Sequence, residues 1–193
     1  MRETWVSIDI EADGPIPGPH SMLSLGAVAF SDDGVELDAF SVNLATLEGA
    51  IGHDETMAWW KTQPKAWAAC REDPKDPALA MPRFSSWLKG LPGRPVAVGY
   101  PVAFDFMFVH WYLHRFTGGS PLSHSALDMK TLAWSLLGGH YRDATKRHMP
   151  RAWFPEKVSH SHVAVEDARE QGQLFLGMVR QLRAASTATI PRR

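Results

Sequence analysis

WVSIDIEADG, residues 5–14, is the stretch that decides the fold. It opens with apolar and β-branched residues, which predict a β-strand. Asp9 and Glu11 are two residues apart and point to one face of that strand, while Ile8 and Ile10 point to the other. Two carboxylates on one face repel each other and lose hydration when buried, so a fold has little reason to keep them without a cation. The alternative is a solvated strand end, which is the more frequent meaning of an isolated D-x-E.

The composition is that of a globular protein with little net charge. Hydrophobic residues make up 45% of the 193, and 20 basic against 21 acidic residues leave a net charge of −1. This length predicts a single domain over residues 1–185, followed by a flexible tail at 186–193. The charge balance argues against an all-over basic surface for long duplexes, so any contact with nucleic acid should be a local patch.

Cysteine usage and hydropathy exclude several classes of protein. The single cysteine, Cys70, excludes an internal disulfide and a zinc site built from cysteines. The sequence has no apolar run of the ~18 residues that a membrane span needs, and no secretory signal is visible before the first strand. We therefore expect a cytoplasmic protein that does not bind membranes.

The rest of the chain carries further strands and then alternates between strands and helices. An apolar run at 22–30, a turn at 31–34 and a strand at 37–44 predict an antiparallel meander with the first strand. The other predicted elements are helices at 54–67 (interrupted near Pro64), 77–91, 104–116, 129–137 and 163–184, and a strand at 95–100 parallel to the first. This order predicts an α/β fold with a mixed sheet. Asp9 and Glu11 then lie at the carboxyl end of a strand, where such sheets bind ligands.

Two later segments carry further acids. Asp105 lies among three phenylalanines near the start of a helix, where an unpaired buried charge would be costly. Its alternative role is a helix N-cap. His162 and Asp167 are five residues apart, with the histidine on the loop before the last helix and the aspartate one turn inside it. Their alternative roles are a surface histidine and an acid favoured by the helix dipole.

Together these residues form the pattern D-x-E, D and H-x4-D. This pattern resembles the DEDDh group of 3′→5′ exonucleases in the ribonuclease H-like superfamily, which includes DnaQ-like proofreading subunits, ribonuclease T and oligoribonuclease. The resemblance covers residues 5–177 and rests on Ile8-Asp9-Ile10-Glu11, Phe104-Asp105 and segment 162–168 (HVAVEDA). It implies a mixed five-stranded sheet, an antiparallel meander followed by parallel strands, flanked by helices. Segment 100–103 (YPVA) departs from the family, which often has His-Asn before Phe-Asp, and this leaves the substrate class open.

The resemblance also implies a mechanism with two divalent cations, Mg²⁺ or Mn²⁺, roughly 3.5–4 Å apart. By this likeness Asp9 would bridge both ions, and Glu11 and Asp167 would complete the shell of one. Asp105 would reach the other ion, partly through water. His162 would be the general base for the attacking water, a task that suits its ordinary pKa of about 6.5.

Several contacts to the substrate are expected near the first motif. Ala12 would offer its backbone N–H to a terminal hydroxyl, and Phe104 is a candidate contact beside the second motif. By resemblance, Met22 or Leu23 would wedge or stack against the last base. The alternative for Met22 and Leu23 is packing in the core of the second strand.

A basic cluster lies at 140–151 and includes Lys146 and Arg147. Because it comes just before His162, it would hold phosphates of the substrate beside the site. The alternative is a solvated loop, and the sequence does not decide between the two.

The predicted function is a metal-dependent 3′→5′ exonuclease that releases nucleoside 5′-monophosphates from single-stranded 3′ ends. RNA or short oligonucleotides are favoured over long DNA, because the chain is small and nearly neutral. The alternatives are a DNA exonuclease of the proofreading or repair type, a non-catalytic nucleic-acid-binding protein of the same fold, and a phosphodiesterase of small nucleotides. Related enzymes are often dimers, which leaves a homodimer open.

Overall fold

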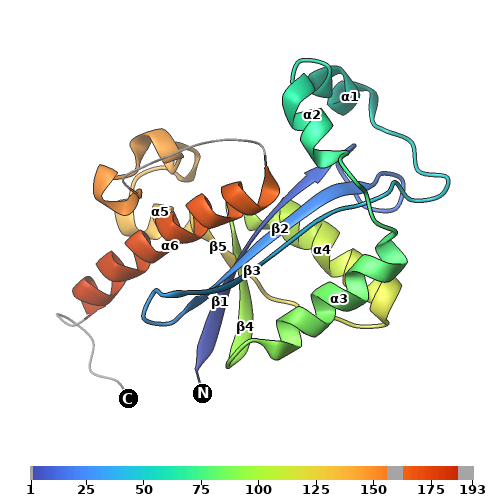
Figure 1. Cartoon of the computed structure of the whole chain (residues 1–193). Helices are drawn as coiled ribbons and strands as arrows, with labels where there is room; N and C mark the ends of the chain where they lie inside the picture. The colour runs from blue at the N-terminus through green and yellow to red at the C-terminus, as the bar shows by residue number, and fades with distance from the viewer. Residues whose placement is uncertain (1, 156–162, 187–193) are drawn as a thin grey trace.

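The structure, a computed structural model, describes residues 2–155 and 163–186. A five-stranded sheet with strand order β3-β2-β1-β4-β5 runs through its centre (Figure 1). The strands are β1 (Glu3–Ala12), β2 (Met22–Ser31), β3 (Glu36–Asn43), β4 (Arg94–Gly99) and β5 (Leu127–Asp128). β2 runs antiparallel to β1 and β3, whereas β4 is parallel to β1 and β5 is parallel to β4. The predicted mixed sheet is therefore confirmed.

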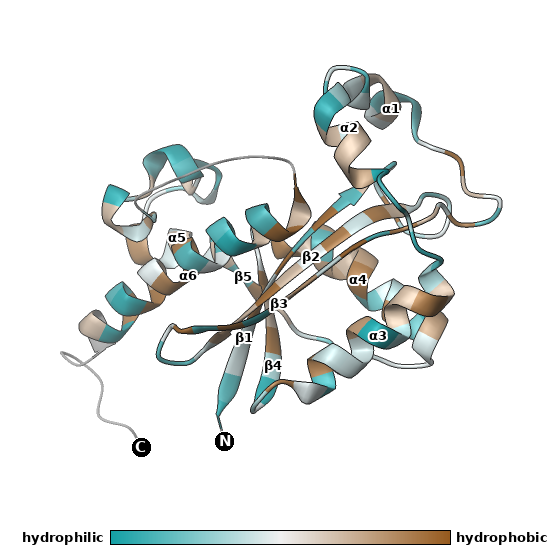
Figure 2. Cartoon of the chain, viewed as in Figure 1, coloured by the Kyte–Doolittle hydropathy of each residue, from teal (hydrophilic) through white to brown (hydrophobic). Residues whose placement is uncertain are grey.

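Helices cover both faces of this sheet. Helices α3 (Pro77–Gly90) and α4 (Val102–Thr117) pack on one face, and α5 (Met129–Leu137) and α6 (Ala164–Ser186) on the other (Figure 1). As a result β2 is buried at nine of its ten positions, and its apolar residues lie between the helical layers in Figure 2. A strand covered on both faces is expected to be apolar throughout rather than alternating, as this one is.

Two short helices, α1 (Asp54–Trp60) and α2 (Pro64–Cys70), lie beyond the carboxyl end of β1 (Figure 1). Their separation confirms the predicted interruption near Pro64, which occupies the first turn of α2, where proline is well tolerated. Leu23 of β2 packs with Trp60 and Cys70 in a small core of its own. The α1–α2 pair is thereby tied to the strand next to β1.

Between α5 and residue 155, the chain makes three short 3₁₀ turns: η1 (Tyr141–Asp143), η2 (Lys146–His148) and η3 (Arg151–Trp153). These turns make up the segment that was predicted as a basic loop. Across the two described ranges, no helix is both long and apolar enough to cross a membrane.

Candidate active site

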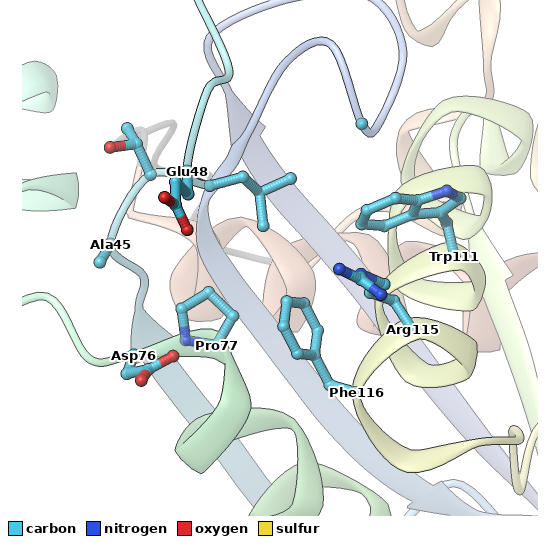
Figure 3. A pocket seen from close by; sticks show the side chains of 10 residues that line it. Ala45, Glu48, Asp76, Pro77, Trp111, Arg115 and Phe116 are labelled. Carbon is cyan, nitrogen blue, oxygen red and sulfur yellow. The ribbon is translucent and has the colours of Figure 1, made fainter.

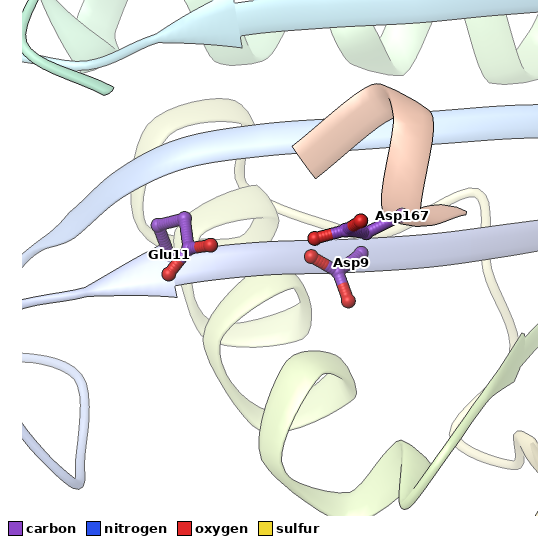
Figure 4. Close-up of side chains that lie close together, drawn as sticks. All are labelled: Asp9, Glu11 and Asp167. Carbon is purple, nitrogen blue, oxygen red and sulfur yellow. The ribbon is translucent and has the colours of Figure 1, made fainter. Parts of the chain in front are cut away.

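The two acids of β1 lie on the face that α6 covers, and their side chains gather with that of Asp167 (Figure 4). Gly26 of β2 is the register partner of Asp9. A Cβ atom at Gly26 would lie 2.2 Å from the carbonyl carbon of Ala164, in the first turn of α6. Glycine therefore lets the start of α6 come down onto the sheet directly beside Asp9.

Asp167 closes a group of three acids. One carboxylate oxygen from each of Asp9, Glu11 and Asp167 lies within 4.8 Å of the other two. Helix α6 is fixed to β1 by Gln171, which lies one turn after Asp167. Nε2 of Gln171 donates a hydrogen bond to the carbonyl oxygen of Ile8 at 2.9 Å. Tertiary packing thus brings together acids that are more than 150 residues apart in the chain.

Asp105 joins this group from α4, on the other side of β1. The ladder between β1 and β4 ends at the pair Ser7–Val98, so the N–H of Ile10 lies beyond the last β4 pair. This N–H donates to Oδ1 of the buried Asp105 at 3.1 Å. Because the N-cap of α4 is Pro101, the alternative role of Asp105 as a helix cap is wrong.

Asp128 fixes the start of the helix that carries Asp105. Its Oδ1 accepts a hydrogen bond from the N–H of Thr131 at 2.7 Å and so caps α5. Its Oδ2 accepts one from the N–H of Val102 at 3.0 Å. With this partner in place, α4 begins at Val102, two residues earlier than predicted.

We call Asp9, Glu11, Asp105 and Asp167 the carboxylate cluster. Burial is the largest cause of raised pKa values in it: it raises the pKa of Asp105 to about 7 and, together with the charges of Asp167 and Asp105, that of Glu11 to about 8. The pKa of Asp9 is raised well above its usual range by burial and then by the charges of its three neighbours. Lys146 is the nearby cation that opposes this rise.

The donor set of the cluster fits a divalent cation. Its ligand atoms are carboxylate oxygens, which are the hard ligands that Mg²⁺ and Mn²⁺ prefer. A bound divalent ion would favour the charged form of each acid and so remove the repulsion that raises the pKa values. The attraction of the acids to a bound cation therefore offsets the energetic cost of burying them together.

The predicted general base, His162, lies outside the described residues, and so does the predicted tail from residue 187 onward. The description resumes at Val163, one residue before α6 begins and four before Asp167. The role of His162 therefore stays a prediction.

The structure corrects two of the predicted contacts to the last base. Met22 and Leu23 have no exposed surface, because the face of β2 that each occupies is covered by other side chains. They are core residues in this structure. Ala12 stays at the edge of the site: a β-bulge separates it from Glu11, and its carbonyl oxygen accepts a hydrogen bond from Nε1 of Trp60 at 2.9 Å.

The two predicted phosphate contacts, Lys146 and Arg147, separate in space although they are neighbours in the chain. Nζ of Lys146 lies 3.8 Å from a carboxylate oxygen of the buried Glu170 and 5.8 Å from the ring centre of Tyr100. Its charge also acts on Asp9. Arg147 is exposed and lines a separate hollow of about 550 Å³ together with residues 137–140. Only the lysine is thus directed to the carboxylate cluster.

Sequence reasoning missed the residues that place the acids. A single glycine inside an apolar strand often marks close approach of another backbone, so Gly26 had a signal that could have been used. Gln171 has none, because a glutamine in the first turns of a helix has no sequence feature that marks it as buried. Asp13, next to the first motif, is buried and accepts a hydrogen bond from the N–H of Ser21, which closes the loop after β1.

A mixed sheet in this order, with acids converging at the carboxyl end of its central strand, defines the class of ribonuclease H-like nucleases. No family model matches the chain. The chain is 32% identical over 178 residues to the 3′-5′ DNA exonuclease Cap18 of Escherichia coli, a match that covers 90% of each protein. It therefore belongs to the DEDDh family of 3′→5′ exonucleases, which are hydrolases of phosphodiester bonds, as the sequence predicted.

Two solved structures share the fold. The nuclease domain of 3′hExo, a DEDDh family member bound to rAMP, matches the whole chain with a TM-score of 0.65 at 11% identity and is itself covered to 98%. E. coli exonuclease I in complex with a dT13 oligonucleotide matches 96% of the chain with a TM-score of 0.65 at 15% identity. This chain spans only 43% of exonuclease I. At these identities the likeness concerns the fold.

Proposed function

We propose that this enzyme removes nucleotides stepwise from the 3′ ends of single-stranded DNA, using two divalent cations and releasing nucleoside 5′-monophosphates. The observation that carries this proposal is the convergence of Asp9, Glu11 and Asp167 within 4.8 Å, at the carboxyl end of the central strand. Asp105 is the fourth member of the same charged group. Four carboxylates balance the charge of two divalent ions, which supports two cations over one.

DNA is favoured over the RNA that chain size and charge predicted. The relative that is 32% identical over nearly the whole chain is named a DNA exonuclease, and exonuclease I shares the fold in a complex with single-stranded DNA. RNA is kept as the second candidate, because the 3′hExo domain with the same fold binds rAMP. The one-domain boundary at residue 185, the homodimer and the cytoplasmic location stay predictions.

Each residue of the site has a separate role in the proposed reaction. The carboxylate cluster would hold the divalent cations, which supply a nucleophilic hydroxide and stabilise the charge on the leaving oxygen. His162 would accept the proton of the attacking water. Lys146, whose charge acts on Asp9, would contact a phosphate oxygen. The backbone N–H of Ala12 and the aromatic ring of Phe104 would both contact the terminal nucleotide.

A time course on 5′-labelled single strands tests the reaction. DNA and RNA of equal sequence are incubated with Mg²⁺, Mn²⁺ or EDTA, and the products are separated by length. A ladder that shortens from the 3′ end on DNA, and is lost in EDTA, supports the proposal. A ladder on RNA alone would reverse the polymer preference, and no ladder on either strand with a folded protein would refute the exonuclease proposal.

A further inference from the structure

The exposed face of α4 carries a row of side chains that begins next to the catalytic acids. Phe104, Met107, Trp111 and Arg115 are spaced by three or four residues and therefore lie on one side of the helix. We call them the α4 stripe. Phe104 is 39% exposed and Met107 is 36% exposed. Phe104 directly precedes Asp105, so the stripe leads away from the carboxylate cluster.

Trp111 stands between two hollows in the surface. One, of about 440 Å³, is lined by Pro17, Met107 and His114 among others. The other, of about 780 Å³, lies between Trp111 and Arg115 on α4 and the segments 45–48 and 76–77 on the opposite wall (Figure 3). Both hollows touch the loop that follows β1. Each is large enough for a flat ring to lie against the indole.

The larger hollow offers one cation, Arg115, to a nucleotide's phosphate. Arg115 is exposed and makes no ion pair with any residue in the described ranges, so its guanidinium is available to a phosphate. Phe116 adds a second aromatic wall. Glu48 and Asp76 lie across the hollow. Oδ1 of Asp76 already accepts a hydrogen bond from the N–H of Ala78 at the start of α3, whereas the carboxylate of Glu48 can accept one from the amino group of a base. Aromatic rings combined with a cation are the usual means of binding single strands.

The spacing along the helix tells which nucleotides reach this surface. Arg115 is ten residues after Asp105, which corresponds to about 15 Å along the helix axis at ~1.5 Å per residue. At a stacked rise of ~3.4 Å per nucleotide, this distance spans roughly four nucleotides. A terminal nucleotide held at the carboxylate cluster, beside Phe104 at the start of the stripe, therefore does not reach Trp111 or Arg115, but the strand behind it does.

We propose that the far part of the α4 stripe binds the substrate strand upstream of its 3′ end, with a base stacked on Trp111 and a phosphate on Arg115. This inference rests on the proposed function, because it takes the carboxylate cluster as the place of the terminal nucleotide. Trp111 and Arg115 then form a second binding site, which long substrates contact and the shortest substrates do not. Occupation of the stripe by another protein is the competing explanation for its exposed apolar side chains, and the test below separates the two.

The test compares a long and a short substrate. KM and kcat are measured for a deoxycytidine decamer and for the dinucleotide with wild type, Trp111→Ala and Arg115→Glu, under the metal condition that supports cleavage. Loss of one stacked base weakens binding roughly 5- to 150-fold. We expect KM for the decamer to rise about 10-fold in each variant, with less than a twofold change for the dinucleotide. Trp134→Ala is the matched control, because this exposed tryptophan lies on α5, on the opposite face of the sheet.

The outcomes separate failure of the stripe from failure of the function. Equal shifts for both substrates, or no shift for either, would overturn the stripe as a strand-binding site and leave the exonuclease intact. Absence of cleavage by wild type would instead refute the proposed function. Trp111 is half-buried against Tyr112, so Trp111→Ala can lose stability. Arg115→Glu changes only an exposed side chain and keeps the test valid in that case.

Discussion

The carboxylate cluster and the α4 stripe are built by opposite means. The cluster is half-buried, with Asp105 as its buried member, collects acids from β1, α4 and α6, and depends on tertiary contacts such as the hydrogen bond from the N–H of Ile10 to Asp105. The stripe is largely exposed, comes from a single helix and depends only on helical spacing. This difference predicts that changes in the cluster abolish turnover, whereas changes in the stripe reduce affinity in graded steps.

The largest effect is expected at the centre of the cluster. Asp9→Asn keeps the shape of the side chain but removes the carboxylate that faces the other three, so we expect turnover to fall at least about 10³-fold, or ~4 kcal/mol. Without metal the variant should be as stable as wild type or more stable, because one repelling charge is gone. Single-turnover kinetics and thermal melting in EDTA measure the two quantities. Asp54→Asn, an exposed acid on α1, is the control that should keep full activity.

The next largest effect is expected at Lys146, and it should differ from the effect at its neighbour Arg147. Lys146→Ala should lower kcat/KM by about 10–100-fold, because a hydrogen bond to a charged group is worth ~1.5–3 kcal/mol. Arg147→Ala should cost only a few-fold and act through the salt dependence of binding, since Arg147 faces a different hollow. Steady-state kinetics at several salt concentrations give both numbers. Equal losses in the two variants would contradict the separation seen in the structure.

A smaller effect is expected in the pH dependence of stability. In the metal-free protein the folded-state pKa values of Glu11 (about 8) and Asp105 (about 7) lie above the ordinary values of 4.5 and 3.8. The folded state then binds more protons than the unfolded state, so stability should fall as pH rises from about 4.5 to 8. Excess Mn²⁺ should flatten this slope by stabilising the charged acids. Melting temperatures in EDTA and in Mn²⁺ across this range provide the measurement, and parallel slopes would speak against a metal site.

The smallest effect is expected at the rim of the cluster. Trp60→Phe removes the hydrogen bond to the Ala12 carbonyl but keeps most of the buried ring. We expect a loss of ~1 kcal/mol in stability and a two- to fivefold drop in kcat, because the end of β1 is held less firmly. Urea unfolding and kinetics on the same preparation report both. A drop as large as that of Asp9→Asn would mean that Trp60 itself takes part in the reaction.

The sequence was sufficient to predict which acidic residues form the site. It was not sufficient to predict the contacts that position them. The alternation of Ile8 and Ile10 with Asp9 and Glu11 predicted both the strand and the shared face of the acids. Met22 could not be placed from sequence, because a methionine on a strand is equally suited to core and to substrate until the covering helices are known. The contact of Asp105 depends on where β4 stops pairing with β1, which is set by the whole sheet.

The α4 stripe also could not be predicted from the sequence alone. Its helical spacing was present in the sequence, but the segment 104–116 was interpreted as a strongly apolar helix without a division into buried and exposed faces. That division depends on which side α3 and the sheet cover. The larger hollow beside Trp111 is lined by three segments outside α4, at residues 18, 45–48 and 76–77, so no local pattern indicates it.

Binding of Mn²⁺ to the metal-free protein tests the central claim most directly. The melting temperatures of wild type and Asp9→Asn are measured as Mn²⁺ is added after EDTA has been removed. A ligand at ~100-fold excess over its Kd adds ~2.7 kcal/mol, which corresponds to a rise of about 5–10 °C for a protein of this size. We predict this rise for wild type and none for Asp9→Asn. An equal rise in both proteins, or none in either, would contradict a metal site at the carboxylate cluster.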